Sequence, residues 1–265
     1  REYVHQRLRS SDIYLSQLDY RFLSDFEAFL FNYYPKGHYK AMSHNTVMKH
    51  IQRLRKMVTL AFHLEWLDKD PFRRWKMIFE KREREFLSKN ELSNLQHAEI
   101  PIDRLDRIRD LFIFSCYTGL SYGDLMKLSE EEISIGIDGK AWIITTRNKT
   151  NNAVKVPLLE PVLGILKKYE DHPITQATGK LLPECSNQKV NLYLKELAMM
   201  VGIKKNLTFH MSRHTFATTV TLSNGVPIET VSKLLGHTKI ATTQIYARVL
   251  EDKISKEMTD LSKKL

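Results

Sequence analysis

Apolar and polar positions alternate with helical spacing through the first third of the chain. Apolar residues recur at three- and four-residue steps over 22–33 and again over 47–62, with polar residues between them. Such spacing gathers the apolar side chains on one face of a helix. Ser43 and Asn45 are both good N-cap residues for the second run. The pattern predicts a helical domain over residues 1–82.

The second of these helices has an unusual polar side. No Asp or Glu lies between Asn45 and Leu64, whereas Lys49, Arg53 and Lys56 share the side opposite the apolar residues. A solvated charged face is the ordinary interpretation. An entirely cationic face also suits a phosphate backbone, because each neutralised phosphate releases condensed counterions. We therefore predict that these three residues contact DNA.

Charge density rises after this helix. The basic run 73–76 is followed by the charged run 81–84. Charge-dense segments between periodic blocks typically mark linkers. We predict a basic hinge in this part of the chain and assign Arg73 and Arg74 to DNA contact.

The remainder of the chain is predicted to be mainly helical with one β-rich insert. Ser88 and Glu91 have the spacing of a capping box, so a new helix and a second domain, 83–265, begin there. Strand-like runs at 141–146 and 153–156 are separated by turn residues. The expected fold is mainly α with a small β-hairpin, as a helical domain followed by a mixed α/β domain. The other runs with helical spacing are 105–117, which ends at Gly119, then 159–170, 187–201, 208–222, 227–235 and 240–250.

Composition narrows the class of protein. The 265 residues include 41 Lys and Arg against 31 Asp and Glu, a net charge of +10, which suggests a polyanionic partner. The two cysteines, Cys116 and Cys185, exclude a disulfide framework and fit a reducing cytosol. No run approaches the roughly 20 apolar residues that a membrane span needs. We expect no membrane partner.

Three C-terminal segments carry the candidate catalytic residues. His210, Arg213 and His214 fall on adjacent turns of one predicted helix. A glycine then ends a helix and presents His237, and Tyr246 follows nine residues later on the next predicted helix. Imidazole and guanidinium groups can bind a phosphate and stabilise the charge that develops on it, while a tyrosine attacks the phosphorus.

Taken singly, these residues also have ordinary structural interpretations. A tyrosine is usually packed with its hydroxyl satisfied. His214 lies beside the apolar Phe216 and Ala217 and can brace its helix, although we assign it to DNA contact. The joint spacing, rather than any single residue, favours a site.

The same segments resemble the C-terminal boxes of the tyrosine recombinase, or phage integrase, family. That family's pattern is His-x-x-Arg-His, then Leu-Gly-His, then a tyrosine about nine residues on. A further box, Thr-Gly-Leu-Arg-x-x-(Glu/Asp)-Leu-x-x-Leu, is matched by residues 118–128, and the family's β-hairpin lysine by Lys149. The match spans 88–250 in the family's order, and the helical 1–80 suits the family's core-binding domain.

The resemblance implies a role for each matched residue. Tyr246 would form a 3′-phosphotyrosyl link and leave a free 5′-hydroxyl. Arg213 and His237 would bind the non-bridging oxygens of the scissile phosphate. His210 would assist proton transfer around the nucleophile, and Lys149 would be the general acid for the leaving oxygen.

The resemblance also implies partners. Members of the family use no metal and no cofactor, and act as tetramers on two double-stranded DNA recombination sites through a Holliday junction. For this chain it implies a bacterial cytoplasmic protein at the nucleoid, with accessory DNA-bending or excision proteins. The start at Arg1 rather than Met, together with the family, is compatible with an N-terminal arm-binding domain, whose presence the sequence leaves open. The tail carries Ile254, Met258 and Leu261 as a narrow apolar stripe, which packs either on its own domain or on a neighbouring protomer.

Position 121 departs from the family pattern. Ser121 stands where the family has its first arginine, and serine cannot replace a guanidinium that grips phosphate. We hypothesise that Arg147 fills the gap, because residues i and i+2 of a strand point to one face and Lys149 would accompany it. The alternative is that Arg147 contacts the DNA backbone outside the site. Integrases of some conjugative transposons resemble this chain in having serine at that position, which favours a recombinase of a mobile element.

Three other functions are open on the sequence. The spacing of His210 and His214 suits zinc ligands, but a hydrolase of that kind has a glutamate between them, and here Arg213 intervenes. Ser121 is the best argument for a DNA-binding regulator that has lost activity. A type IB topoisomerase shares the phosphotyrosine chemistry without synapsis of two sites.

Overall fold

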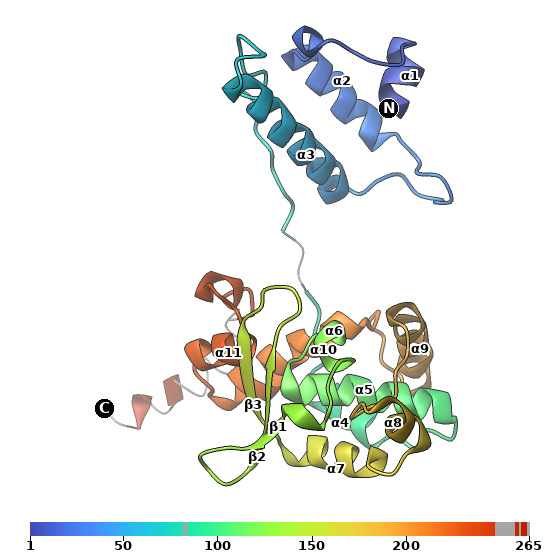
Figure 1. Cartoon of the computed structure of the whole chain (residues 1–265), viewed down its shortest axis with the longest axis vertical. Coiled ribbons are helices and arrows are strands. Elements are labelled where there is room, and N and C mark those ends of the chain that lie inside the picture. Colours follow the sequence, from blue (N-terminus) through green and yellow to red (C-terminus); the bar gives the residue numbers. More distant parts are fainter. Residues whose placement is uncertain (82–83, 247–257, 260, 264–265) are drawn as a thin grey trace. The chain divides into compact units, whose positions relative to one another are not determined.

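The structure is a computed structural model that describes residues 1–81, 84–246, 258–259 and 261–263. It divides into two compact units, residues 1–83 and 84–265, called here the first and second units (Figure 1). Mainly helical architecture with one small antiparallel sheet confirms the predicted fold class. Among the described residues, no helix combines the length and apolarity needed to cross a bilayer.

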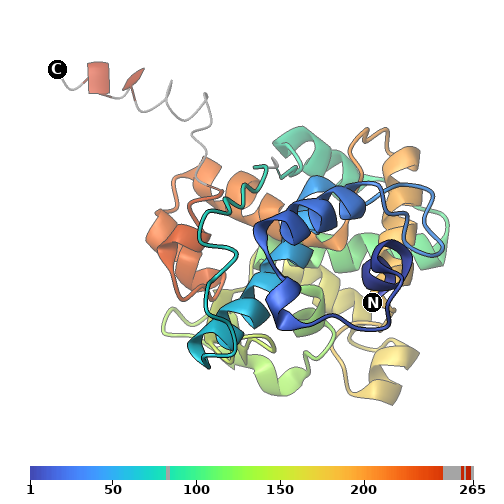
Figure 2. The ribbon, with the colours of Figure 1, turned by 90° about the horizontal axis from the view of Figure 1, so that it is seen from above.

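Over its described residues, the first unit contains the α-helices α1 (Glu2–Leu8), α2 (Tyr20–Phe31) and α3 (His44–His63) and a short 3-10 helix, Leu15–Gln17. Asp19 begins α2 by accepting a hydrogen bond from the amide of Phe22 at 2.7 Å. Helices α2 and α3 pack side by side (Figures 1 and 2). Their apolar faces meet in a core made of Leu18, Leu23, Leu30, Val47, Met48, Ile51, Val58, Phe72 and Trp75.

The basic segment after α3 belongs to the first unit. Phe72 and Trp75 are buried in the core of this unit. Further on, the side-chain amide of Asn45 bonds both the N–H and the C=O of Glu80, each at 2.9 Å. The prediction that a hinge includes residues 73–76 is therefore wrong. A local count of charges could not reveal that an indole within the run is buried.

The second unit is organised around one buried helix. Ser88 and Glu91 form the predicted capping box at the start of α4 (Lys89–His97), with N–H to oxygen distances of 2.8 and 3.2 Å. Helix α5 (Asp103–Thr118) follows, with most of its last three turns buried. It packs against α4, α7 (Glu160–Tyr169), α9 (Asn187–Met200) and α10 (Phe209–Thr215), and it ends at Gly119, as predicted. Because α5 has neighbours on several sides, it fixes where its C-terminal end lies.

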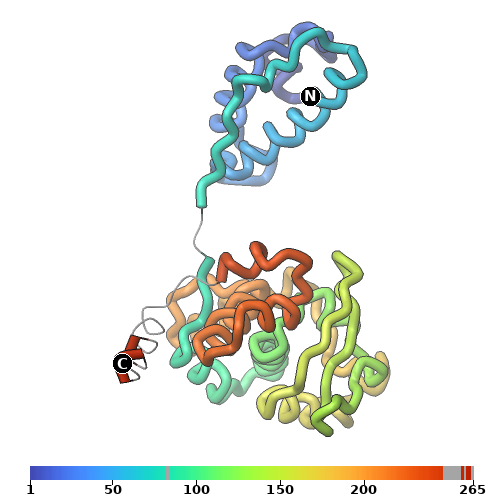
Figure 3. The backbone as a smooth tube through the Cα atoms, turned by 90° about the vertical axis from the view of Figure 1, so that its left-hand side faces the viewer, coloured from blue at the N-terminus to red at the C-terminus, as the bar shows by residue number. Residues whose placement is uncertain are grey.

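The sheet has three antiparallel strands in the order β1 (Ile133–Ile135), β2 (Ala141–Thr146) and β3 (Ala153–Pro157). The two longer strands match the predicted runs. Ile143 lies opposite Val156, and both are buried against the helices. In Figure 3 the hairpin of β2 and β3 runs along one side of the second unit.

The remaining helices carry or support the residues of interest. The predicted helix over 208–222 is α-helical only to Thr215 and continues as a π-helical segment, Phe216–Thr221. The hydroxyl of Thr221 donates to the carbonyls of Phe216 and Ala217, which shows side chains competing for main-chain acceptors. The helices concerned are α6 (Tyr122–Leu125), α7 (Glu160–Tyr169), α8 (Pro173–Thr178), α9 (Asn187–Met200), α10 (Phe209–Thr215) and α11 (Ile228–Leu234).

The segment around the tyrosine also differs from its prediction. A helix was expected over 240–250, but a 3-10 turn at Ile240–Thr242 is followed by further turns up to Tyr246. Residues 247–250 lie outside the described residues. So does Ile254, whereas Met258 and Leu261, the other two residues of the predicted apolar stripe, are described and exposed.

The chain enters the second unit at a fixed point. The amide of Leu87 donates to the hydroxyl of Thr215 at 3.0 Å, and its carbonyl accepts from the hydroxyl of Thr219. Leu87 is fully buried. The carbonyl of Phe86 accepts from Lys205 at 2.8 Å. The entry is thus fastened to α10 and to the π-helical segment that continues it.

Gly119 offers a test of how tightly the end of α5 is packed. Its φ is +69°, and a Cβ there would lie 2.4 Å from Cδ1 of Phe216. Gly179 has nearly the same φ, +66°, with open space around it. We expect Gly179→Ala to lower the free energy of unfolding by about 1–2 kcal/mol, because of the left-handed backbone alone. Gly119→Ala should lower it by about 1–3 kcal/mol more, because the added methyl group overpacks the core. Calorimetric unfolding of both full-length variants measures the difference, and equal losses would contradict it.

Candidate active site

Arg213 lies at the centre of the candidate site. Its side chain leaves α10 and is 3% exposed. Its two terminal nitrogens donate to the main-chain carbonyls of Gly119 and Leu235, at the ends of α5 and α11. Burial, and then the nearby charge of Arg147, lower the pKa of Arg213 to about 10. The guanidinium is therefore held by neutral acceptors and is still charged at neutral pH.

His237 stands beside this guanidinium. Gly236, with φ +62°, ends α11, and the amide of His237 donates to the carbonyl of Ser232 at 3.0 Å. This turn brings Nε2 of His237 to 3.3 Å from Nη2 of Arg213. On the other side of the ring, Nδ1 lies 2.9 Å from the hydroxyl of Thr243. The ring is thus fixed at both nitrogens.

Tyr246 packs against the histidines. It is 7% exposed, and its ring stacks on that of His237, with centroids 6.3 Å apart and planes 11° apart. The ring of His214 lies 5.1 Å away. Burial raises the pKa of the Tyr246 phenol, whereas Arg213, Arg84 and Arg147 lower it. The pKa of Tyr246 remains raised, so the nearby cations offset only part of the effect of burial.

His210 and His214 occupy successive turns of α10. Their rings meet edge to face at 4.6 Å, with His210 exposed and His214 buried. Burial, then His210 and Arg84, lower the pKa of His214 to about 3. Within the described part of the chain, Nδ1 of His214 has no hydrogen-bond partner. Its burial favours the bracing interpretation over the predicted DNA contact.

Ser121 caps the short helix α6 and binds the acid that follows it. Its hydroxyl donates to Oδ2 of Asp124 at 2.7 Å. Oδ1 of the same carboxylate accepts the amide of Asn148 at 2.9 Å. Nε of Arg147 lies 3.8 Å from Oδ2. The buried carboxylate of Asp124 therefore joins the serine to the hairpin.

Arg147 reaches the site from the hairpin turn rather than from a strand. Strand β2 ends at Thr146, so the argument that i and i+2 share a strand face does not hold. The stem of Arg147 lies against Gly236, where a Cβ would come within 2.6 Å of Cδ. Nη1 lies 3.5 Å from the carbonyl of Gly236. Lys149, by contrast, is exposed in the turn.

The predicted DNA-binding residues of the first unit are all on its surface. Lys49, Arg53 and Lys56 are exposed along α3. Arg73 and Arg74 are exposed and lie in the chain between the buried Phe72 and Trp75. Their exposure leaves them available to a phosphate backbone.

Three contributors to the site were not given roles from the sequence. Asp124 had a signal, because the family's box carries an acid at that position. Asn152, which donates to the carbonyl of Gly236 at 3.1 Å, lies in a turn that the sequence marks only as a turn. Thr243 had no signal, since neighbouring threonines are indistinguishable until the fold buries one of them.

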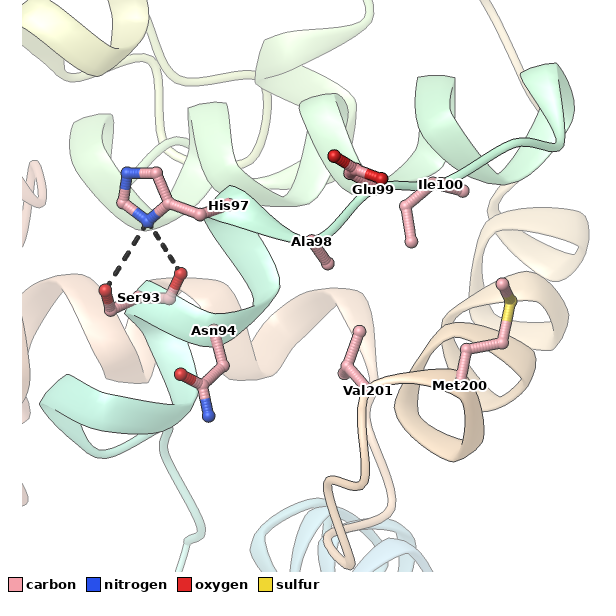
Figure 4. A pocket seen from close by; sticks show the side chains of 8 residues that line it. All are labelled: Ser93, Asn94, His97, Ala98, Glu99, Ile100, Met200 and Val201. Atoms are coloured by element: carbon pink, nitrogen blue, oxygen red, sulfur yellow. Dashed lines mark hydrogen bonds between the residues drawn. The ribbon is translucent and has the colours of Figure 1, made fainter.

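Two hollows in the second unit differ in their relation to these residues. One of about 310 Å³ is lined by Ser121, His210 and Arg213, and so opens onto the candidate site. Another, of about 450 Å³, lies where α4 and α9 end, and its lining includes His97 and Met200 (Figure 4). The second hollow contains none of the candidate residues. Among the described residues, no three His, Cys, Asp or Glu side chains are grouped to hold a metal, so His210 and His214 lack a third ligand there.

Comparison with known proteins gives two family matches. The model of the phage integrase family matches residues 85–253, and that of the phage integrase SAM-like domain matches residues 1–77. The tyrosine recombinase XerA of Pyrococcus furiosus is 34% identical over 153 residues, 54% of this chain and 51% of the relative. A tyrosine recombinase of Thermosipho africanus is 32% identical over 183 residues, 68% of this chain and 62% of the relative. The chain spans about half the length of the first of these curated relatives.

Solved structures share the fold. The Tn1549 transposon integrase in complex with circular intermediate DNA has a TM-score of 0.69 at 18% identity, over 97% of this chain and 90% of that one. The XerH site-specific recombinase bound to difH substrate has a TM-score of 0.67 at 19% identity, over 97% of this chain and 75% of that one. At such identities the likeness is one of fold.

The pKa of His237 tests whether Arg147 belongs to the site. Burial, Arg213 and Arg147 together lower this pKa to about 4. Removing a cation favours the imidazolium, so Arg147→Gln should raise the pKa toward the ordinary value. Lys149→Gln, a matched change in the same turn, should leave it in place. NMR titration of ¹⁵N-histidine-labelled protein measures both, and an unmoved pKa in Arg147→Gln would refute the placement.

Proposed function

The chain belongs to the phage integrase family, and on that premise we propose that it is a tyrosine site-specific recombinase that cuts and rejoins DNA. The observation that carries the proposal is the enclosure of the Tyr246 ring by His214 and His237, with the buried Arg213 beside them. Within the described residues, the guanidinium of Arg213 donates to main-chain carbonyls and not to a carboxylate, which supports a role for it as a fixed donor to a phosphate beside the nucleophile.

In the proposed reaction the scissile phosphate is bound by Arg213 and His237. The hydroxyl oxygen of Tyr246 forms a bond to phosphorus, and the bond from phosphorus to the 5′-oxygen breaks. A 3′-phosphotyrosyl link results, and the bond energy is retained for the reverse step with another 5′-hydroxyl. No metal and no cofactor takes part in this scheme.

Proton movements are assigned to two residues at the rim. His210 takes the phenolic proton, because its lowered pKa, caused by partial burial and by Arg84 and Arg213, leaves the imidazole neutral at neutral pH. The same cations that lower the pKa of His210 favour the tyrosinate. Lys149, exposed in the hairpin turn, donates a proton to the leaving 5′-oxygen.

Arg147 supplies the cation that Ser121 lacks. Its guanidinium is 3.8 Å from the carboxylate that Ser121 also binds, and its charge lowers the pKa of both Arg213 and His237. A cation close enough to perturb both phosphate-binding residues is placed to share their ligand.

The first unit supplies a sequence-independent grip on DNA. Lys49, Arg53 and Lys56 form one cationic stripe on α3, and Arg73 and Arg74 add charge nearby in the same unit. Such contacts neutralise phosphates and position the duplex without reading its bases.

The biological role we propose is recombination of a mobile genetic element, of the conjugative-transposon kind, through a Holliday junction within a DNA-bound tetramer. Ser121 in the first box is the residue that favours this class. The similar fold of the Tn1549 transposon integrase on circular intermediate DNA is consistent with it.

Covalent trapping tests the nucleophile. Labelled, nicked duplexes from the ends of the element that encodes the protein are mixed with wild type or with Tyr246→Phe, without metal, and run on a denaturing gel. We expect a shifted, protease-sensitive band for wild type alone, because only the phenol can form the phosphotyrosine. Binding of the duplex by both proteins with no band from either would favour a DNA-binding regulator.

The role of Arg147 is tested by moving the arginine from position 147 to position 121. Arg147→Ala should slow single-turnover cleavage about 100-fold or more, the usual cost of losing a transition-state donor. Ser121→Arg in the same background should restore part of that rate, because the hollow beside Ser121 opens toward His210 and Arg213. Lys155→Ala, which removes an exposed cation from β3, is the control.

Cleavage by Arg147→Ala at close to the wild-type rate would refute the proposal that Arg147 takes the place of the arginine missing at position 121. If Arg147→Ala cleaves slowly and the added Ser121→Arg does not raise the cleavage rate, Arg147 would instead have a structural role in the hairpin.

A further inference from the structure

The hydroxyl of Thr243 faces the back of the His237 ring. Oγ1 lies 2.9 Å from Nδ1, and within the described residues this is the hydrogen bond found for that nitrogen. Thr243 is fully buried, whereas its neighbour Thr242 is exposed. A buried hydroxyl placed against one ring nitrogen controls what the other nitrogen can do.

In the empty site the protons of this pair follow from the donors around it. Nε2 of His237 faces Nη2 of Arg213 at 3.3 Å, and a guanidinium can only donate. Nε2 must therefore accept, so a neutral ring carries its proton on Nδ1. The Nδ1–H then donates to the hydroxyl of Thr243.

A bound phosphate reverses this requirement. Non-bridging phosphate oxygens only accept, so Nε2 must carry a proton to bind one. If the ring stays neutral, Nδ1 then becomes an acceptor and needs a donor. A hydroxyl can rotate and donate, whereas a carbonyl or a carboxylate in the same place could only accept.

We propose that Thr243 is a positioning residue that allows His237 to change tautomer when the scissile phosphate enters the site. Its hydroxyl accepts from Nδ1–H in the empty site and donates to Nδ1 in the occupied site. One proton leaves Nδ1 and one arrives at Nε2 by exchange with water at the half-buried ring, so the ring remains neutral. The inference rests on the phosphate-binding role proposed above for His237.

The same residue belongs to the turn that presents the nucleophile. The amide of Tyr246 donates to the carbonyl of Thr243 at 2.9 Å, and the Tyr246 ring stacks on His237. The side chain of Thr243 thus acts on the histidine while its main chain holds the tyrosine. Orientation of the phosphate-binding ring and of the attacking phenol is set by one residue.

Kinetics of three variants test the hydroxyl. Thr243→Val keeps the shape and removes the hydroxyl, Thr243→Ser keeps the hydroxyl, and Thr242→Val makes the same change at the exposed neighbour. Single-turnover cleavage of the nicked duplex should fall about 10- to 100-fold in Thr243→Val, as for other residues that orient a binding histidine. Thr243→Ser should stay within about 3-fold of wild type, and Thr242→Val should be unchanged. Duplex affinity should be the same in all three.

Equal rates for Thr243→Val and wild type would overturn the inference. So would Thr243→Ser being as slow as Thr243→Val, because the hydroxyl would then not be what matters.

NMR of the His237 ring tests the tautomer directly and does not depend on how Thr243→Val folds. ¹⁵N-histidine-labelled Tyr246→Phe protein is measured free and bound to intact duplex. We expect the proton on Nδ1 in the free protein and on Nε2 in the complex. The same tautomer in both states, or a doubly protonated ring in the complex, would overturn the inference. Failure of covalent trapping by wild type would instead count against the proposed function, since the NMR experiment requires no cleavage.

Discussion

A buried guanidinium keeps its charge. The protein around Arg213 therefore has to supply hydrogen-bond acceptors that do not neutralise this charge. Here the acceptors are the carbonyls of Gly119 and Leu235, which stand at helix ends where main-chain carbonyls lack partners within the helix. Helix C-termini also carry partial negative charge, which suits a cation. A carboxylate in their place would stabilise Arg213 and compete with phosphate. Three helices are thereby required to converge, and the close packing of Gly119 against Phe216 and Leu235 follows from that convergence.

With serine at position 121, the positive charges near the candidate site come from several elements. Arg213 comes from α10, Arg147 from the hairpin turn, and Arg84 from the chain that enters the second unit. Burial, and then the charge of Arg147, lower the pKa of Arg213, whereas Arg84 acts on the pKa values of His210, His214 and Tyr246. In the reaction proposed above, a phosphodiester would relieve the repulsion between these cations, and that relief would contribute to its binding.

Much of the fold could be predicted from local patterns. The capping box at Ser88, the glycine end of α5 and both long strands each depend on residues a few positions apart, and these predictions are confirmed. The predictions that failed depend on contacts distant in sequence. Trp75 draws a basic run into a core, and the hydroxyl of Thr221 binds carbonyls within the π-helical segment.

The candidate site shows the same division. The histidines, the arginine of α10 and the tyrosine could be identified by their spacing, because the helix and the turn that carry them are formed by residues close in sequence. Arg147 was chosen on a strand argument that is wrong, yet it lies beside Asp124 because the turn folds back over α6. Thr243 could not be distinguished from Thr242 by sequence, since only the tertiary structure buries one and exposes the other.

Leu87 joins the start of the second unit to the helical stretch that carries Arg213. Both polar groups of its main chain are bound by hydroxyls of Thr215 and Thr219, on the helical stretch that also supplies Arg213. Displacing Leu87 would break both of these hydrogen bonds and leave its buried main-chain groups without partners, which is costly. We therefore expect the segment at Leu87 and the helical stretch that carries Arg213 to unfold together, as one cooperative unit.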